Sequence, residues 1–133
     1  MRIVSLLLRS AVAMPLCLAL TTSIVSAEVL VNGWRKLDPI NQAAYMQGVL
    51  DVATTLSQSS RESAKNKGLD IRDFWKLRPD VAFYASIGCD RVSQLPPEQK
   101  LAILQKHVNN NPEKWDYPMT FMVQNAFWKM CEE

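Results

Sequence analysis

The sequence predicts an all-α protein, a small bundle of four to five short helices closed by one disulfide. Apolar residues recur at three- and four-residue spacing in several segments, which is the pattern of amphipathic helices. No segment after residue 35 shows the alternation of apolar and polar residues that is typical of a strand. Two cysteines in the part of the chain expected to fold supply the disulfide.

The N-terminal residues 1–27 are typical of a secretory signal peptide. Arg2 and Arg9 provide the initial positive charge, an apolar run follows, and small residues precede a cleavage point after Ala27. The apolar run is shorter than the roughly 20 residues that a membrane anchor needs. We therefore expect export to the periplasm, removal of the signal, and one all-helical domain over residues 28–133 with no membrane attachment.

Signal removal also changes the charge of the protein. The full chain has 15 Lys and Arg against 13 Asp and Glu, and the signal holds two of the arginines and no acid. The remaining chain would carry 13 charges of each sign, interspersed along its length. Nucleic-acid binding needs a basic face, so this balance disfavours a nucleic-acid partner.

Cys89 and Cys131 are the two cysteines that remain without the signal. An even pair in an exported protein predicts a disulfide. In the chain-entropy account, closing a loop of this length is worth on the order of 4 kcal/mol. A reactive thiol and a metal ligand are the alternative roles of these cysteines.

The first helix has a clear start at Asp38, a good N-cap, followed by Pro39 at the first helical position. Its apolar stripe becomes weaker near residues 57–60, and we expect the helix to end there. Gly48 lies in its middle and is interpreted as a point of close approach between helices. The preceding lead-in, residues 28–37, is expected to be extended or disordered, with Trp34 packing back on the core.

Residues 58–70 are polar and without apolar periodicity, so they are predicted to form a linker. The alternative is that the first helix extends through Lys65 until Gly68 stops it. After a short helical turn over 70–78, Asp80 is expected to cap a second helix that runs from residue 81 to about 91, and Gly88-Cys89 is expected to end or kink this segment.

Two more helices are predicted in the C-terminal part. The first covers residues 98–108, with a buried stripe of Leu101, Leu104 and Val108 and a stop at 109–112. The second runs from Pro118 to Cys131 with Asp116 as its cap. Its methionine and aromatic stripe is interpreted as core, with a pliable binding face as the alternative.

The residues show no catalytic machinery, so we expect no enzyme, no catalytic residue, no cofactor and no metal. His107 is the single histidine, and we interpret it as a surface residue at a helix end. A Cys–His nucleophile needs a thiolate, which a disulfide removes. Two cysteines and one histidine at wide spacing do not form a zinc pattern, and no glycine-rich phosphate loop is present.

Two parts of the chain resemble a known family. The segment Tyr45-Met46-Gln47-Gly48-Val49-Leu50-Asp51 is similar to the aromatic–x–x–Gly–Val–x–Asp segment of the Rap/Tai-type immunity proteins. The second half resembles the same family, with Cys89, Gln94-Leu95, a helix to Asn111-Pro112, Tyr117-Pro118 and a closing helix that ends in Cys131. A further cysteine that the family often has before the first segment is absent here.

The resemblance implies a periplasmic antidote to peptidoglycan amidases delivered by type VI secretion. Such a protein blocks the amidase sterically, often as a homodimer, by inserting a loop into the catalytic groove. The candidate contact surfaces are then the 58–70 linker, with Lys65 and Lys67, and the 109–118 loop, with Trp115 and Tyr117. The alternative function is a periplasmic helical binding or chaperone-like protein without a toxin partner.

Overall fold

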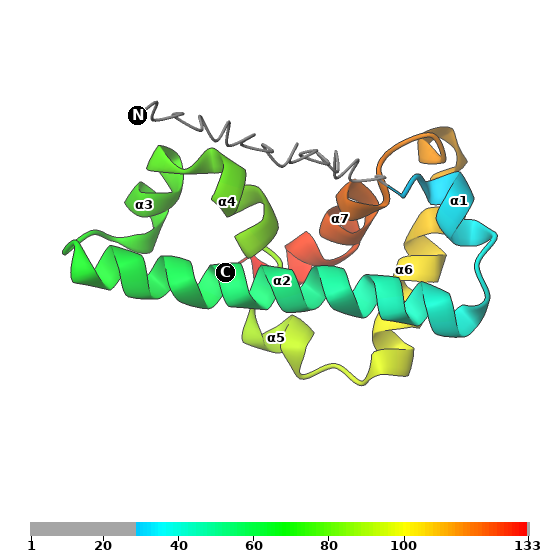
Figure 1. Ribbon diagram of the computed structural model, residues 1–133, viewed down its shortest axis with the longest axis horizontal. Coiled ribbons are helices and arrows are strands. Elements are labelled where there is room, and N and C mark those ends of the chain that lie inside the picture. The colour runs from blue at the N-terminus through cyan, green and yellow to red at the C-terminus, as the bar shows by residue number, and fades with distance from the viewer. Residues whose placement is uncertain (1–28, 133) are drawn as a thin grey trace, which may run out of the picture.

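The computed structural model describes residues 29–132, which form an all-α fold as predicted (Figure 1). The predicted signal peptide lies outside the described residues. Along this part of the chain the elements are α1 (Val31–Arg35), α2 (Pro39–Asn66), α3 (Ile71–Leu77), α4 (Pro79–Ala85), α5 (Asp90–Ser93), α6 (Pro97–Asn109), the 3-10 turn η1 (Pro112–Lys114) and α7 (Met119–Cys131). The expected number of four to five short helices is too low, because the lead-in forms α1 and the expected second helix is divided into α4 and α5.

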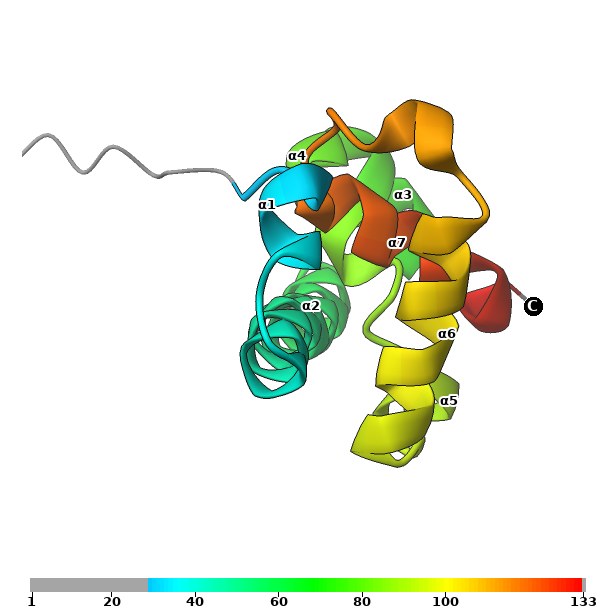
Figure 2. The same cartoon turned by 90° about the vertical axis from the view of Figure 1, so that its right-hand side faces the viewer.

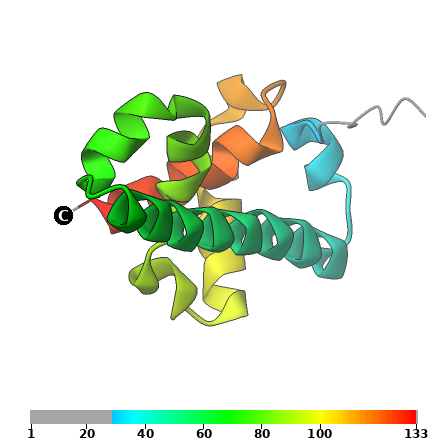
Figure 3. The same ribbon diagram turned by 60° about the vertical axis from the view of Figure 1, so that its left-hand side comes forward.

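Helix α2 is the longest element and organises the others. It has 28 residues, a length of about 40 Å. Helices α3 and α4 arch over its C-terminal half, while α6 and α7 pack against the rest (Figures 1 and 3). Viewed from the N-terminal end of α2, α1 lies above this end and α6 stands beside it (Figure 2).

The two ends of α2 follow from specific residues. Asp38 caps the start as predicted, because its Oδ1 accepts from the Asn41 backbone N–H at 3.0 Å. Gly68 ends the helix with a φ of 65°, a conformation that glycine adopts without strain. The backbone N–H groups of Gly68 and Leu69 donate to the carbonyls of Lys65 and Ala64 at 3.1 and 3.0 Å, which is a Schellman motif.

The predicted linker over residues 58–70 is therefore wrong for most of its length, and the alternative of an extended first helix is correct. The buried face of α2 continues past Ala53 through Ser57, Ser60 and Ala64. These side chains are small, so neighbouring elements pack closely against them, but two of them are polar and break the apolar pattern. The polar stretch is a helix because its small residues face the α3–α4 arch.

Close helix approach occurs at Gly88 and not at Gly48. A Cβ at Gly48 would meet nothing within 4 Å, whereas one at Gly88 would lie 2.3 Å from the Ala53 carbonyl oxygen and 2.9 Å from the Ser57 Cβ. The chain therefore passes directly over α2 between α4 and α5. This passage separates α4 from α5 at Gly88-Cys89, where the sequence predicts that the second helix ends or kinks.

Two of the predicted helix caps are also wrong. Helix α4 begins at Pro79, and Asp80 pairs with Arg78 at 3.0 Å instead of capping a helix. Helix α7 has Pro118 at its N-cap position with no side-chain cap, while Asp116 accepts from the Asn32 Nδ2 at 3.0 Å. In both places a proline fixes the start of the helix, and the aspartate has a different partner.

The core gathers around α7. Its methionine and aromatic stripe is interior, as interpreted, since Met119, Met122 and Phe127 are fully buried. Trp34 of α1 is also buried and packs into this core as expected, although its segment is helical and not extended. The rest of the main core comes from α1, α2, α5, α6, α7 and the connection between α4 and α5: Val31, Met46, Leu50, Ala53, Ile87, Val92, Leu104, Val108 and Val123.

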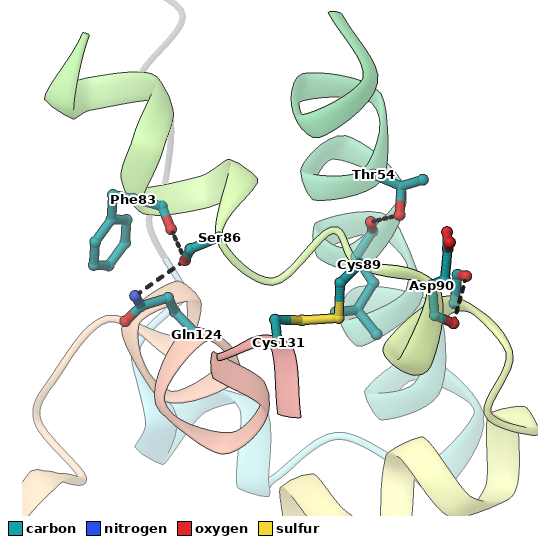
Figure 4. Close-up of a disulfide and its surroundings, with 9 residues drawn as sticks. Thr54, Phe83, Ser86, Cys89, Asp90, Gln124 and Cys131 are labelled. Atoms are coloured by element: carbon teal, nitrogen blue, oxygen red, sulfur yellow. Dashed lines mark hydrogen bonds between the residues drawn. A yellow bond between two sulfur atoms is a disulfide. The ribbon is translucent and has the colours of Figure 1, made fainter. Parts of the chain in front are cut away.

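The predicted disulfide is present. Cys89, at the start of α5, and Cys131, the last residue of α7, are joined with an S–S distance of 2.02 Å and a Cα–Cα distance of 5.7 Å (Figure 4). The bridge fixes the end of the last helix to the chain that crosses α2. It encloses α5, α6, η1 and α7 within one covalent loop.

Candidate functional site

The loop of residues 110–118, here called the α6–α7 loop, is held firmly by α1. The backbone N–H of Asn32 donates to the Trp115 carbonyl at 3.0 Å, and that of Val31 donates to the Tyr117 carbonyl at 3.1 Å. The Met119 N–H donates to the Val29 carbonyl at 2.8 Å. The loop is thus ordered before any partner arrives.

The Trp115 side chain helps to anchor the α6–α7 loop. Its Nε1 donates to the Val108 carbonyl at 3.1 Å, and the Arg35 guanidinium carbon lies 3.4 Å from its ring centroid. Tyr117, two residues on, is 47% exposed, with its ring 5.5 Å from that of Phe121. Of the two aromatic residues proposed as contacts, Trp115 holds the loop and Tyr117 is presented to solvent.

Lys65 and Lys67 lie elsewhere in the molecule. Lys65 is exposed in the last turn of α2, and Lys67 follows the helix with its Nζ 5.6 Å from the Phe74 ring centroid. Figure 1 places this end of α2 opposite the α6–α7 loop. The two candidate contact surfaces therefore lie at opposite ends of α2. A single loop inserted into a partner's groove cannot use both of them.

The surface formed by the described residues includes two hollows of interest. The larger, of about 340 Å³, lies between α2, α5 and the start of α6, and we call it the α2–α5–α6 groove. Its polar lining comprises Gln47, Asp51, Thr54, Thr55, Ser93 and Lys100. The smaller, of about 200 Å³, lies beside the disulfide and includes Arg61, Trp75 and Trp128. Neither hollow is predicted from the sequence.

One charged side chain stands out in the α2–α5–α6 groove. Lys100 is only 6% exposed, and its Nζ donates to the Ser93 carbonyl at 3.3 Å. A signal for its burial exists in the sequence, because Lys100 precedes Leu104 and Val108 at four-residue spacing and so shares their buried face. The predicted stripe contained Leu101 in its place, which is only half-buried.

His107 is less exposed than predicted. It is half-buried near the end of α6, and its Nε2 has no hydrogen-bond partner among residues 29–132. Burial, with a further contribution from the nearby Lys114 charge, lowers the pKa of His107 from its ordinary value of 6.5. The imidazole is therefore neutral at pH 7.

Over the described range, no group of three or more His, Cys, Asp and Glu side chains is arranged to hold a metal ion. Among the helices of residues 29–132, none has the length and apolar character that crossing a bilayer requires. No protein-family model, curated protein or solved structure matches the chain.

Proposed function

We propose that this protein is a periplasmic immunity-type protein that binds a peptidoglycan amidase toxin and blocks its catalytic groove. In this proposal the signal peptide directs export, and the disulfide forms in the oxidising periplasm. The protein acts by occupying the amidase groove and catalyses no reaction itself.

The observation that carries this proposal is the anchored α6–α7 loop with Tyr117 at its surface. A steric inhibitor gains affinity from a segment that is ordered in advance, because less conformational entropy is lost on binding. Tyrosine is among the residues most often found at the energetic centre of an interface. The backbone bonds from α1 supply the order, and Tyr117 supplies the contact.

The test is inhibition of type VI peptidoglycan amidases by the oxidised protein, measured as the rate of cleavage of purified cell-wall sacculi. The variant Tyr117→Glu is expected to lose inhibition, because a carboxylate replaces the aromatic anchor. Tyr84→Glu is the matched control, since Tyr84 is 38% exposed on α4, away from the loop. The double variant K65E/K67E tests the other candidate surface and is expected to inhibit normally.

A helical binding protein without a toxin partner is the alternative function. The hollow beside the disulfide favours it, because two tryptophans and Arg61 line a space of about 200 Å³. Failure to bind any amidase would remove the immunity proposal and leave this alternative. Equal inhibition by wild type and Tyr117→Glu would remove the loop from the mechanism.

A further inference from the structure

The α2–α5–α6 groove has the composition of a binding site for a charged ligand. It lies at the N-terminal end of α6, whereas the α6–α7 loop follows the C-terminal end, so the groove and the loop are separate surfaces (Figures 1 and 2). Leu50 and Val92 provide apolar contact, and the other lining residues are polar or charged. Binding of a ligand in this groove would be independent of the proposed amidase inhibition.

Lys100 is buried in unfavourable surroundings. Its ammonium group has three N–H donors, and within residues 29–132 one acceptor, the Ser93 carbonyl, is hydrogen-bonded to it at 3.3 Å. No carboxylate of the described chain lies within 4.0 Å of its Nζ. It also lies in the first turn of α6, where the helix dipole favours acidic side chains over basic ones.

A buried charge normally has a partner of opposite sign, because its desolvation is otherwise uncompensated. An anion entering the groove would give Lys100 that partner. The molecule that carries this anion should also carry hydrogen-bond donors, because the other polar groups considered in the groove are acceptors.

Those other polar groups are acceptors. The Thr54 and Thr55 hydroxyls donate to the carbonyls of Leu50 and Asp51, each at 2.9 Å, which leaves oxygen lone pairs free to accept. Asp51 itself is an exposed carboxylate, with Oδ1 accepting from the Gln47 Nε2 at 2.7 Å. Backbone N–H groups of an extended segment would satisfy these oxygens.

We propose that the α2–α5–α6 groove binds an acidic peptide segment, with Lys100 paired to the carboxylate of a Glu or Asp side chain and with Asp51, Thr54 and Thr55 accepting from the N–H groups of that segment. A simple inorganic or organic anion would use Lys100 alone. The segment's N–H donors distinguish the proposed ligand from such an anion.

The test is a titration of the isotope-labelled, oxidised protein, expressed from its full sequence, followed by amide chemical shifts. The probes are acetyl-Gly-Glu-Gly-Gly-amide, its Gln counterpart and sodium acetate. We expect the Glu peptide to shift resonances of α5, the first turn of α6 and residues 47–55. We expect it to bind at least about tenfold more tightly than the Gln peptide, because a charge-assisted bond replaces a neutral one.

The variant Lys100→Met keeps the length of the buried stem and removes the charge, so the preference for Glu over Gln should disappear. Lys106→Met is the matched control, because it removes the same charge from an exposed position of α6. Equal binding of both peptides to the wild type, a Glu preference that survives Lys100→Met, or acetate binding as tight as the Glu peptide would each overturn the proposal. None of these outcomes depends on amidase inhibition, so failure here leaves the proposed function to its own test.

Discussion

Trp34 and Gln42 exchange two hydrogen bonds across the corner between α1 and α2. The Trp34 Nε1 donates to the Gln42 carbonyl at 3.2 Å, and the Gln42 Nε2 donates to the Trp34 carbonyl at 3.3 Å. The Gln42 Oε1 also accepts from the Gln105 Nε2 of α6 at 2.9 Å. One buried amide therefore joins α1, α2 and α6, and it fixes the segment that anchors the α6–α7 loop.

The substitution Gln42→Leu should reduce the free energy of unfolding by about 1–3 kcal/mol, because it removes both hydrogen bonds of the Gln42 side-chain amide, the one to the Trp34 carbonyl and the one from the Gln105 Nε2. The Trp34 carbonyl keeps one donor, the Leu37 backbone N–H at 3.0 Å. Urea denaturation followed by tryptophan fluorescence measures the change. Gln58→Leu is the matched control, since Gln58 is exposed on the same helix and its replacement should stay within about 0.5 kcal/mol of wild type. An equal effect of the two variants would show that the Gln42 amide is not a structural junction.

The sequence predicted the helical class, the cap of α2, the burial of Trp34 and the disulfide, because each has a local signal. It missed the last third of α2 because the buried stripe there consists of Ser57, Ser60 and Ala64, and the hydropathy of serine does not mark a buried face. Only the close passage of the α3–α4 arch makes small residues favourable on that face. This is a tertiary relationship without a pattern in the local sequence.

Alanine substitutions at Gly88 and at Gly48 should change the stability of the protein in opposite directions. Gly88→Ala should destabilise the protein by about 1–3 kcal/mol or more, because the new Cβ would overlap the backbone of Ala53 and one of the two segments must move. Gly48→Ala should stabilise it by up to about 1 kcal/mol, since alanine favours a helix interior and the added methyl group has open space.

Thermal unfolding of the two glycine variants against wild type provides the measurement. Shifts of opposite sign are expected. A stabilised Gly88→Ala variant would contradict the close passage over α2, and a strongly destabilised Gly48→Ala variant would restore Gly48 as a point of helix contact.

The candidate site was harder to predict than the fold. The exposure of Tyr117 agrees with its proposed role, but the anchoring of Trp115 depends on Arg35 and on the Val108 carbonyl, which the chain brings together only on folding. The groove around Lys100 forms where α2 meets α5 and α6, which follow it in the chain only after α3 and α4. Its one sequence signal is a lysine at four-residue spacing from Leu104 and Val108, and a basic residue near a helix end is ordinarily taken as exposed.

The disulfide should account for a large part of the stability. Its cysteines are 42 residues apart, and closing a loop of this length is worth about 4 kcal/mol in the chain-entropy account. The double variant C89A/C131A should therefore unfold at a much lower urea concentration than the oxidised wild type. Reduced wild type serves as the control for the lost side-chain packing and should unfold close to the double variant. Coincident urea curves for oxidised and reduced protein would contradict a stabilising role.

His107 should make the protein less stable in mild acid. Because its pKa is lowered in the folded state from 6.5, the unfolded chain takes up a proton at a higher pH than the folded chain does. The free energy of unfolding should thus decline as pH falls from about 6.5 towards the folded pKa, and it should be independent of this group above that range. The variant His107→Gln has no proton to take up and should show a flatter profile between pH 7.5 and 5.5 in urea titrations.

The pKa of Asp38 is also lowered, chiefly by the Asn41 backbone N–H, so both proteins should share a further loss of stability at more acidic pH. A neutral, desolvated His107 would be contradicted if the free energy of unfolding had the same pH dependence in wild type and His107→Gln between pH 7.5 and 5.5. A gain in wild-type stability on acidification from pH 7 would contradict it as well.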